Sequence, residues 1–353
     1  LHELSQETRK LRGFVKDKRK HADAVQTGQL FTADYALEIF CRLGPDFGNI
    51  SYMEKWQICN QLGGNEACRI AKLPANELLR LVPWGGLAAC ISRDDSNSST
   101  SAKDGLAYCF LPLPVRTGLP VMVNGFFELS SNRRDIWQSG SDMTGDGKTR
   151  AEWNVSLLEG VISPCYVRLL LRLKKLLGYS AHFQHFWPSN KVGNPWDIVV
   201  KCTLSLCRSE KLLKVCSNQL ELDAFFSHDD VILDTSCNAS LASGNGNGNG
   251  NGNGNGEWIA CDQAILLPGC DSYGLSGTQD LRRLALFFVH SGQPLVLCES
   301  SLMTTLCTKQ IGTLHLPRAT CEYVATPKFT RTILALEEVA RKFIANDTLK
   351  ALS

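Results

Sequence analysis

Three sets of residues have the types that could bind phosphate, bind a metal or act as a nucleophile, but none of them has the rest of its motif. Gly145–Thr149 (GDGKT) ends like a phosphate-binding loop, yet Asp142 stands where that loop needs its first glycine. His182 and His185 lie near cysteines, but the sequence has no Cys-x-x-Cys pair. None of the 15 cysteines lies in a nucleophile signature. The sequence therefore predicts no metal site and no enzymatic activity for the chain on its own.

The best-patterned elements lie between residues 106 and 177. Two apolar runs, Leu106–Leu113 and Pro120–Leu129, predict a β-hairpin over residues 106–129. Apolar residues spaced three and four apart predict a helix over residues 154–177, which Gly178 ends. Ser163-Pro164 should kink this helix or start a second one, and Arg168 falls late in it, at the negative end of the helix dipole.

The order of these elements predicts an α/β (α+β) fold with two mixed subdomains. Residues 1–30 form a basic leader helix or tail, and residues 31–243 contain the hairpin and the helix. Residues 244–256 alternate glycine and asparagine and therefore form a flexible linker, whose regularity suggests engineering. Residues 257–353 form the second α/β subdomain.

Composition excludes several classes of protein. The net charge of +2 gives no reason to expect a nucleic-acid partner, and no apolar stretch reaches the ~18 residues that predict a membrane span. Most cysteines lie in apolar runs, which is typical of buried thiols in a reducing compartment, so we expect the cytoplasm, with the nucleus as alternative. The chain begins with Leu1 rather than methionine, and we expect it to be part of a larger protein.

One long segment resembles a known family. Residues 105–137 (GLAYCFLPLPVRTGLPVMVNGFFELSSNRRDIW) and 150–154 (RAEWN) strongly resemble the repeat region of the sacsin family, and the plant members are the more similar. Weaker similarity lies in four further segments: Trp56 with Gly63-Gly64, residues 80–89, residues 258–268 and residues 292–297.

This resemblance implies a segment of a very large chaperone that acts in protein quality control. In that family each repeat begins with an ATP-binding domain of the GHKL type, related to the ninety-kilodalton heat-shock chaperone, and this chain resembles the middle-domain-like part that follows. We expect ATP and magnesium in the upstream domain and no cofactor in this chain. The implied partners are that ATPase domain and client proteins or co-chaperones. The alternative is a protein–protein interaction module without coupling to an ATPase.

The resemblance also suggests a role for two adjacent arginines. The middle domain of the related heat-shock chaperone sends an arginine to the γ-phosphate of ATP, since a guanidinium stays charged and its fork matches phosphate oxygens. Arg133 and Arg134 are the corresponding candidates here, with Arg116 as a lesser one. The competing interpretation is that Arg133 and Arg134 pair with Asp135, Glu128 or Glu152 and only fix the loop.

The other conspicuous residues of the motif are expected to be structural. Asn124-Gly125 interrupts the second apolar run and predicts a bulge or tight turn. Trp137 and Trp153 are expected in the core. Asn132 directly precedes the two arginines and is also expected to have a structural role.

Overall fold

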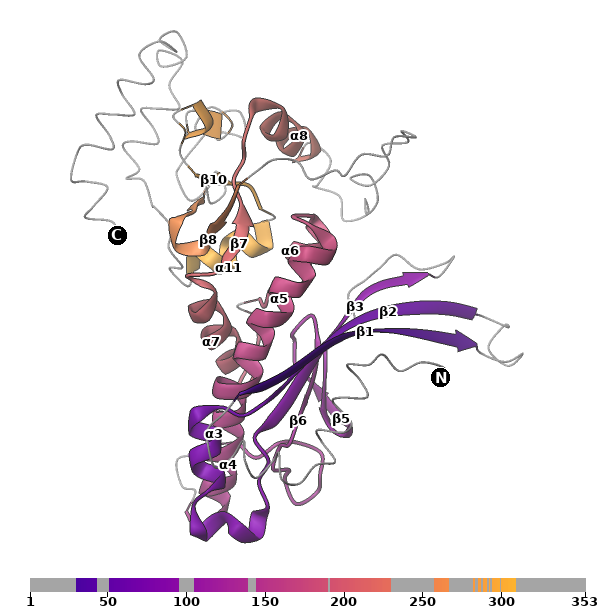
Figure 1. Ribbon diagram of the computed structural model, residues 1–353, viewed down its shortest axis with the longest axis vertical. Coiled ribbons are helices and arrows are strands. Elements are labelled where there is room, and N and C mark those ends of the chain that lie inside the picture. Colours follow the sequence, from indigo (N-terminus) through magenta and orange to yellow (C-terminus); the bar gives the residue numbers. More distant parts are fainter. Residues whose placement is uncertain are drawn as a thin grey trace, which may run out of the picture. The chain divides into compact units, whose positions relative to one another are not determined.

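The computed structural model describes residues 30–42, 51–94, 105–138, 144–189, 191–229, 257–266, 282, 285, 286, 288–290, 292, 294–298 and 300–308 (Figure 1). The chain divides into two compact units, Leu1–Leu206 and Cys207–Ser353. The candidate site lies in the first unit.

Six described strands of the first unit form one sheet in the order β1-β2-β3-β6-β4-β5. Neighbours pair antiparallel except β4 and β6, which are parallel. The pairing of β2 with β3 runs from Leu62 opposite Trp84 to Met53 opposite Asp94, with one register shift between Lys55 and Trp56. The strands are β1 (Phe31–Arg42), β2 (Ser51–Leu62), β3 (Trp84–Asp94), β4 (Leu106–Cys109), β5 (Leu111–Arg116) and β6 (Met122–Gly125).

One long helical segment packs against this sheet. It consists of α4 (Asp146–Leu157), a π-helical turn η3 (Leu158–Ile162) and α5 (Ser163–Leu177), and α5 contacts β2 and β3 (Figure 1). The apolar side chains of α5 that face the sheet are fully buried because their three- and four-residue spacing places them on one side of the helix. The remaining helices are α3 (Asn65–Ala71), η2 (Pro74–Leu79), α6 (Ala181–His185) and α7 (Asp197–Cys207).

Pro164 accounts for the irregular turn in this helix. In a regular α-helix the amide of residue 164 would donate to the carbonyl of residue 160, but proline has no amide hydrogen. The side chain of Gln61 on β2 supplies the missing donor, with its Nε2 3.2 Å from the Gly160 oxygen. Ser163 Oγ donates to the Leu158 oxygen at 2.7 Å. The Leu158 oxygen also accepts the Ser163 amide across the π-helical turn, so Gln61 is the side chain that replaces the amide hydrogen missing at Pro164.

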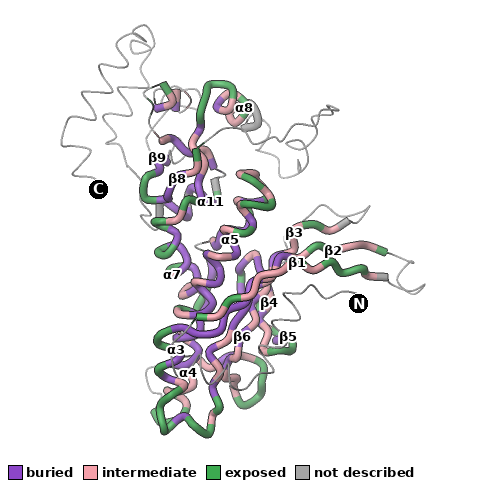
Figure 2. The backbone as a smooth tube through the Cα atoms, viewed as in Figure 1, coloured by how far each residue is buried: buried purple, intermediate pink, exposed green. Residues whose placement is uncertain are grey.

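The helical stretch Asp146–Leu177 is long and apolar enough to span a membrane, but 67% of its most apolar window is buried inside the protein. Figure 2 shows buried residues concentrated along this helix and the adjoining parts of the strands. The sheet already covers its apolar side, so its composition is that of a core helix.

The described residues of the second unit form two small sheets and several short helices. β7 (Lys211–Lys214) pairs antiparallel with β8 (Trp258–Ala260), and β9 (Ile265–Leu266) pairs parallel with β10 (Leu295–Val296). A single bridge between Val215 and Val296 connects the two sheets. The other elements are α8 (Gln219–Asp229), the short 3₁₀ helix η4 (Cys261–Gln263) and α11 (Ser300–Thr308).

The predicted mixture of helices and strands is confirmed, but the predicted hairpin over residues 106–129 is wrong in its pairing. β4 forms its antiparallel pair with β5, through the single residue Phe110, whereas β6 runs parallel to β4. The turn lies inside the first apolar run, where Phe110 makes it at φ 62° without a glycine or proline to mark it.

The helix ends at Leu177 as predicted but begins at Asp146, earlier than the predicted residue 154. The predicted subdomain boundary also differs from the contacts. β7 and β8 pair across residues 244–256, so residues 211–214 belong with the second unit, and the division falls after Leu206. Residues 1–29 of the predicted leader and the Gly-Asn tract lie outside the described residues.

Candidate functional site: an arginine loop

The loop that follows β6 presents the two predicted arginines, and we call residues 128–138 the arginine loop. Its two ends are joined by an antiparallel bridge between Leu129 and Ile136. The Trp137 amide donates to the Glu128 oxygen at 2.9 Å. The loop is therefore closed by backbone pairing, like a short hairpin.

The base of the loop is bound to α4 by Asn154, whose side chain is 1% exposed. Asn154 Nδ2 donates to the carbonyl oxygens of Glu128 (2.8 Å) and Trp137 (2.9 Å), and its Oδ1 accepts from the Glu128 amide (2.9 Å). This one amide therefore holds both ends of the loop. Arg150 forms an ion pair with Glu128, and Trp153 Nε1 donates to the Phe126 oxygen at 2.8 Å.

The outer part of the loop is ordered by its own polar groups. Ser130 Oγ donates to Asn132 Oδ1 at 2.7 Å, and Asn132 Oδ1 also accepts from the Arg134 amide at 3.0 Å. The Arg133 amide donates to the Ser130 oxygen at 2.8 Å. Arg133 has φ 54°, a left-handed conformation that costs a residue with a Cβ about 1–2 kcal/mol. The hydrogen bonds of the loop offset that cost.

Arg133 and Arg134 are both exposed. The carboxylates proposed as their partners bind other groups among the described residues: Glu128 pairs with Arg150, and Glu152 lies 3.8 Å from Lys148 Nζ. Asp135 accepts hydrogen bonds from the Ile136 amide and from Gln138. Two guanidinium groups therefore project from a fixed loop, an arrangement that suits an anion with several oxygens.

The structure does not bring Arg116 to this loop. Arg116 lies on β5 opposite Leu106, at the far end of β4 from Cys109. Cys109 is the neighbour of the loop, since its Sγ lies 3.5 Å from the Phe127 oxygen. Burial raises the pKa of the Cys109 thiol, and the nearby charge of Arg133 opposes that rise.

The other motif residues have structural contacts. Asn124 Oδ1 accepts from the Phe110 amide at 3.1 Å, and β6 runs without a register shift to its end at Gly125. A Cβ on Gly125 would lie 2.8 Å from the Phe127 ring, so close packing requires glycine there. Trp153 is fully buried, whereas Trp137 is half-buried at the base of the arginine loop.

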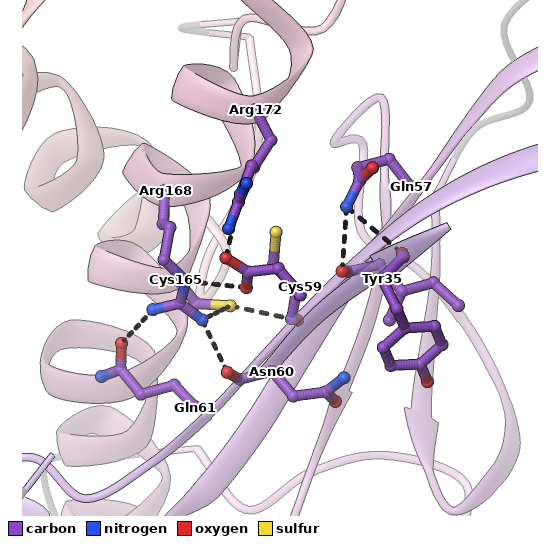
Figure 3. Close-up of polar contacts among 10 residues, drawn as sticks. Tyr35, Gln57, Cys59, Asn60, Gln61, Cys165, Arg168 and Arg172 are labelled. Carbon is purple, nitrogen blue, oxygen red and sulfur yellow. Dashed lines mark hydrogen bonds and ion pairs between the residues drawn. The ribbon is translucent and has the colours of Figure 1, made fainter. Parts of the chain in front are cut away.

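An ion cluster between β1, β2 and α5 was not predicted from the sequence (Figure 3). Its Asp34 side chain is buried, Arg168 is mostly buried and Arg172 is half-exposed. Arg168 binds Asp34 Oδ1 (2.9 Å), Gln61 Oε1 (3.2 Å) and the Asn60 oxygen (2.6 Å), and Arg172 binds Asp34 Oδ2 (3.2 Å). Asp34 and Arg168 are 134 residues apart, so no local pattern relates them. The cluster fixes α5 against the edge strand β1.

The two buried cysteines beside the ion cluster, Cys59 and Cys165, are not activated thiols. Burial raises the pKa of Cys165 to about 12 despite the opposing charge of Arg168, and it raises that of Cys59 still further. A thiol protonated at neutral pH is a poor nucleophile. Within the described ranges, no group of three or more His, Cys, Asp or Glu side chains could hold a metal ion.

Comparison with known proteins gives one informative relative. Human sacsin is 42% identical to this chain over 124 residues, which is 34% of the chain and 2% of the length of sacsin. No family model matches the chain, and no solved structure matches it. Identity of 42% over 124 residues shows common ancestry of the matched segments. This chain therefore contains a segment that is similar to part of human sacsin.

Proposed function

We propose that the chain is a middle-domain-like segment of a sacsin-type chaperone and couples ATP turnover in an upstream domain to clients or neighbouring segments. The observation that supports this proposal best is the arginine loop, whose two exposed guanidiniums are held on a fixed base. Glu128 is already paired with Arg150, and Asp135 accepts hydrogen bonds from the Ile136 amide and from Gln138. The similarity to human sacsin supports the chaperone class.

The arginine loop fits the task of contacting a nucleotide that another domain holds. A guanidinium close to a transferring phosphoryl group stabilises the charge that develops in the transition state, and a pre-positioned donor does so without reorganisation. Asn154 and the Glu128–Arg150 pair provide that positioning here. In this proposal ATP and magnesium belong to the upstream domain, and the chain itself hydrolyses nothing. We also propose a cytoplasmic location and a relationship closest to the plant members of the family.

ATP hydrolysis by the longer protein tests this proposal. Replacing Arg133 and Arg134 by alanine should lower turnover about 10²-fold while nucleotide affinity is retained, because the lost contacts act in the transition state. Arg80→Ala is a matched control, since Arg80 is also exposed and has a left-handed φ of 49°. Unchanged turnover in the double variant would exclude the sensor role.

A second candidate is a protein–protein interaction module without ATPase coupling. The observation in its favour is a pair of adjacent, strongly exposed apolar side chains, Phe110 and Leu111, at the turn between β4 and β5. Unchanged turnover in the arginine variants together with binding of a protein partner at this turn would favour the module.

A further inference from the structure

The turn between β4 and β5 exposes two large apolar residues in sequence, and we call Phe110 and Leu111 the β4–β5 tip. Phe110 is 59% exposed and Leu111 is 74% exposed. Single exposed apolar residues are normal on protein surfaces, but adjacent ones on a rigid element are typical of a binding site.

Phe110 is held firmly although it is exposed. Its ring stacks on Trp84 at 5.5 Å between centroids and 5° between planes, and it meets Phe126 edge-on at 5.8 Å. Its amide donates to Asn124 Oδ1 at 3.1 Å. A pre-organised aromatic side chain loses little conformational entropy when a partner binds it.

The backbone at Phe110 is strained. Its φ of 62° is unfavourable for a bulky side chain, and glycine would adopt it at lower cost. The fold therefore maintains an exposed phenylalanine where the backbone conformation favours glycine. Such outliers concentrate at binding and catalytic sites.

The strand that leads away from the tip restricts how a partner can bind. β5 is an edge strand, and its residues Pro112 and Pro114 are exposed and lack amide hydrogens. Prolines on an edge strand prevent its extension by another strand. The partner must therefore be recognised through side chains.

The arginine loop starts beside the tip. The Sγ of Cys109, the residue directly before Phe110, lies 3.5 Å from the oxygen of Phe127, which precedes the loop, and the exposed Arg133 and Arg134 follow in that loop. Among the described residues the loop's own carboxylates, Glu128 and Asp135, are engaged by Arg150, Ile136 and Gln138. Glu128 is ion-paired with Arg150, so among the described residues the remaining charges of the loop are two arginines and Asp135, which is a net positive charge. An apolar anchor next to this charge is complementary to carboxylates flanking an aromatic or leucine side chain.

We propose that the β4–β5 tip and the arginine loop together bind an acidic protein segment that carries an aromatic or leucine anchor. The anchor packs on Phe110 and Leu111, and flanking carboxylates bind Arg133 and Arg134. This inference does not require the arginines to contact a nucleotide. Peptide binding therefore tests it independently of any effect of Arg133 and Arg134 on ATP turnover.

Binding of labelled peptides to the full 353-residue chain, followed by fluorescence anisotropy, tests the proposal. The probe is a glutamate-rich peptide with one central phenylalanine, compared with one in which alanine replaces phenylalanine and one in which lysine replaces glutamate. The glutamate–phenylalanine peptide should bind most tightly, and added salt should weaken it because the rim charges are exposed.

The variants locate the binding. Leu111→Asp should weaken the glutamate–phenylalanine peptide about 10-fold or more, as expected for an interface hot spot. Phe110→Gly should weaken binding of the same peptide to a similar extent, and glycine adopts the φ of 62° without strain. This second variant keeps the test valid if Leu111→Asp folds poorly. Leu78→Asp is the control, since Leu78 is 94% exposed and belongs to another element, η2. Equal binding of the three peptides, or an equal loss in Leu78→Asp, would overturn the proposal.

Discussion

Gln61 provides the sharpest quantitative test of how the fold is built. Its side chain is 1% exposed and makes three polar contacts: Nε2 donates to the oxygens of Gly160 (3.2 Å) and Gly63 (3.3 Å), and Oε1 accepts from Arg168 (3.2 Å). Gln61→Met keeps the shape of the side chain but removes all three contacts. Leaving buried polar groups without partners costs about 1–3 kcal/mol, so we expect a loss of about 2–3 kcal/mol in the free energy of unfolding.

The part of this loss that comes from Gly160 can be isolated. Pro164→Ala restores an amide hydrogen one turn after Gly160, so the Gly160 oxygen no longer depends on Gln61. Gln61→Met should therefore cost about 1 kcal/mol less in the Pro164→Ala background than in the natural sequence. Changes in the unfolded chain caused by proline cancel in this double-mutant cycle.

Urea unfolding of the four proteins, monitored by circular dichroism, measures the cycle. Equal costs of Gln61→Met in both backgrounds, within about 0.3–0.5 kcal/mol, would refute the explanation of the π-helical turn.

Three further predictions concern the loop and the histidines. Asn154→Ala should lower the free energy of unfolding by about 2–3 kcal/mol, because it leaves the Glu128 amide and the Trp137 oxygen without their partner. Replacing the exposed Asn132 by alanine should cost less than about 1 kcal/mol. Urea unfolding measures both costs, and equal values would contradict the role of Asn154. Arg133→Gly should raise stability by about 0.5–1 kcal/mol in thermal unfolding while it impairs turnover, and a destabilised variant would show that the left-handed backbone is not strained. His182 and His185 are exposed, but their rings pack against Phe186, and this partial desolvation lowers the pKa of both. The unfolded chain therefore binds more protons below the ordinary histidine pKa of about 6.5, and stability should fall modestly as the pH drops through that value. The double variant His182→Gln/His185→Gln should lose part of this pH dependence, and an unchanged profile would contradict it.

Local sequence patterns predicted the features that depend on neighbouring residues. The end of the helix at Leu177 follows from the glycine after it, and the apolar stripe of α5 follows from its spacing. The start of α4 at Asp146 was missed because its first two turns, through Trp153, are mainly polar and carry no stripe.

Long-range pairing could not be predicted in this way. β6 pairs with β3, which ends 28 residues earlier in the chain (122 − 94), and the Asp34–Arg168 pair connects the edge strand to the helix. Arg133 and Arg134 were proposed because their residue type suits phosphate, and their role stays a prediction. Asn154, which holds the loop that carries them, was not predicted. A single asparagine in a helix gives no signal of three hydrogen bonds to a distant loop.

Single-turnover hydrolysis of ATP by the longer protein is the most direct test of the proposed coupling, because it separates the chemical step from nucleotide binding and product release. We predict that Arg133→Ala/Arg134→Ala slows the chemical step about 10²-fold, whereas Arg80→Ala leaves it unchanged. An equal rate in the double variant and the natural sequence would contradict the account and leave the chain as a binding segment.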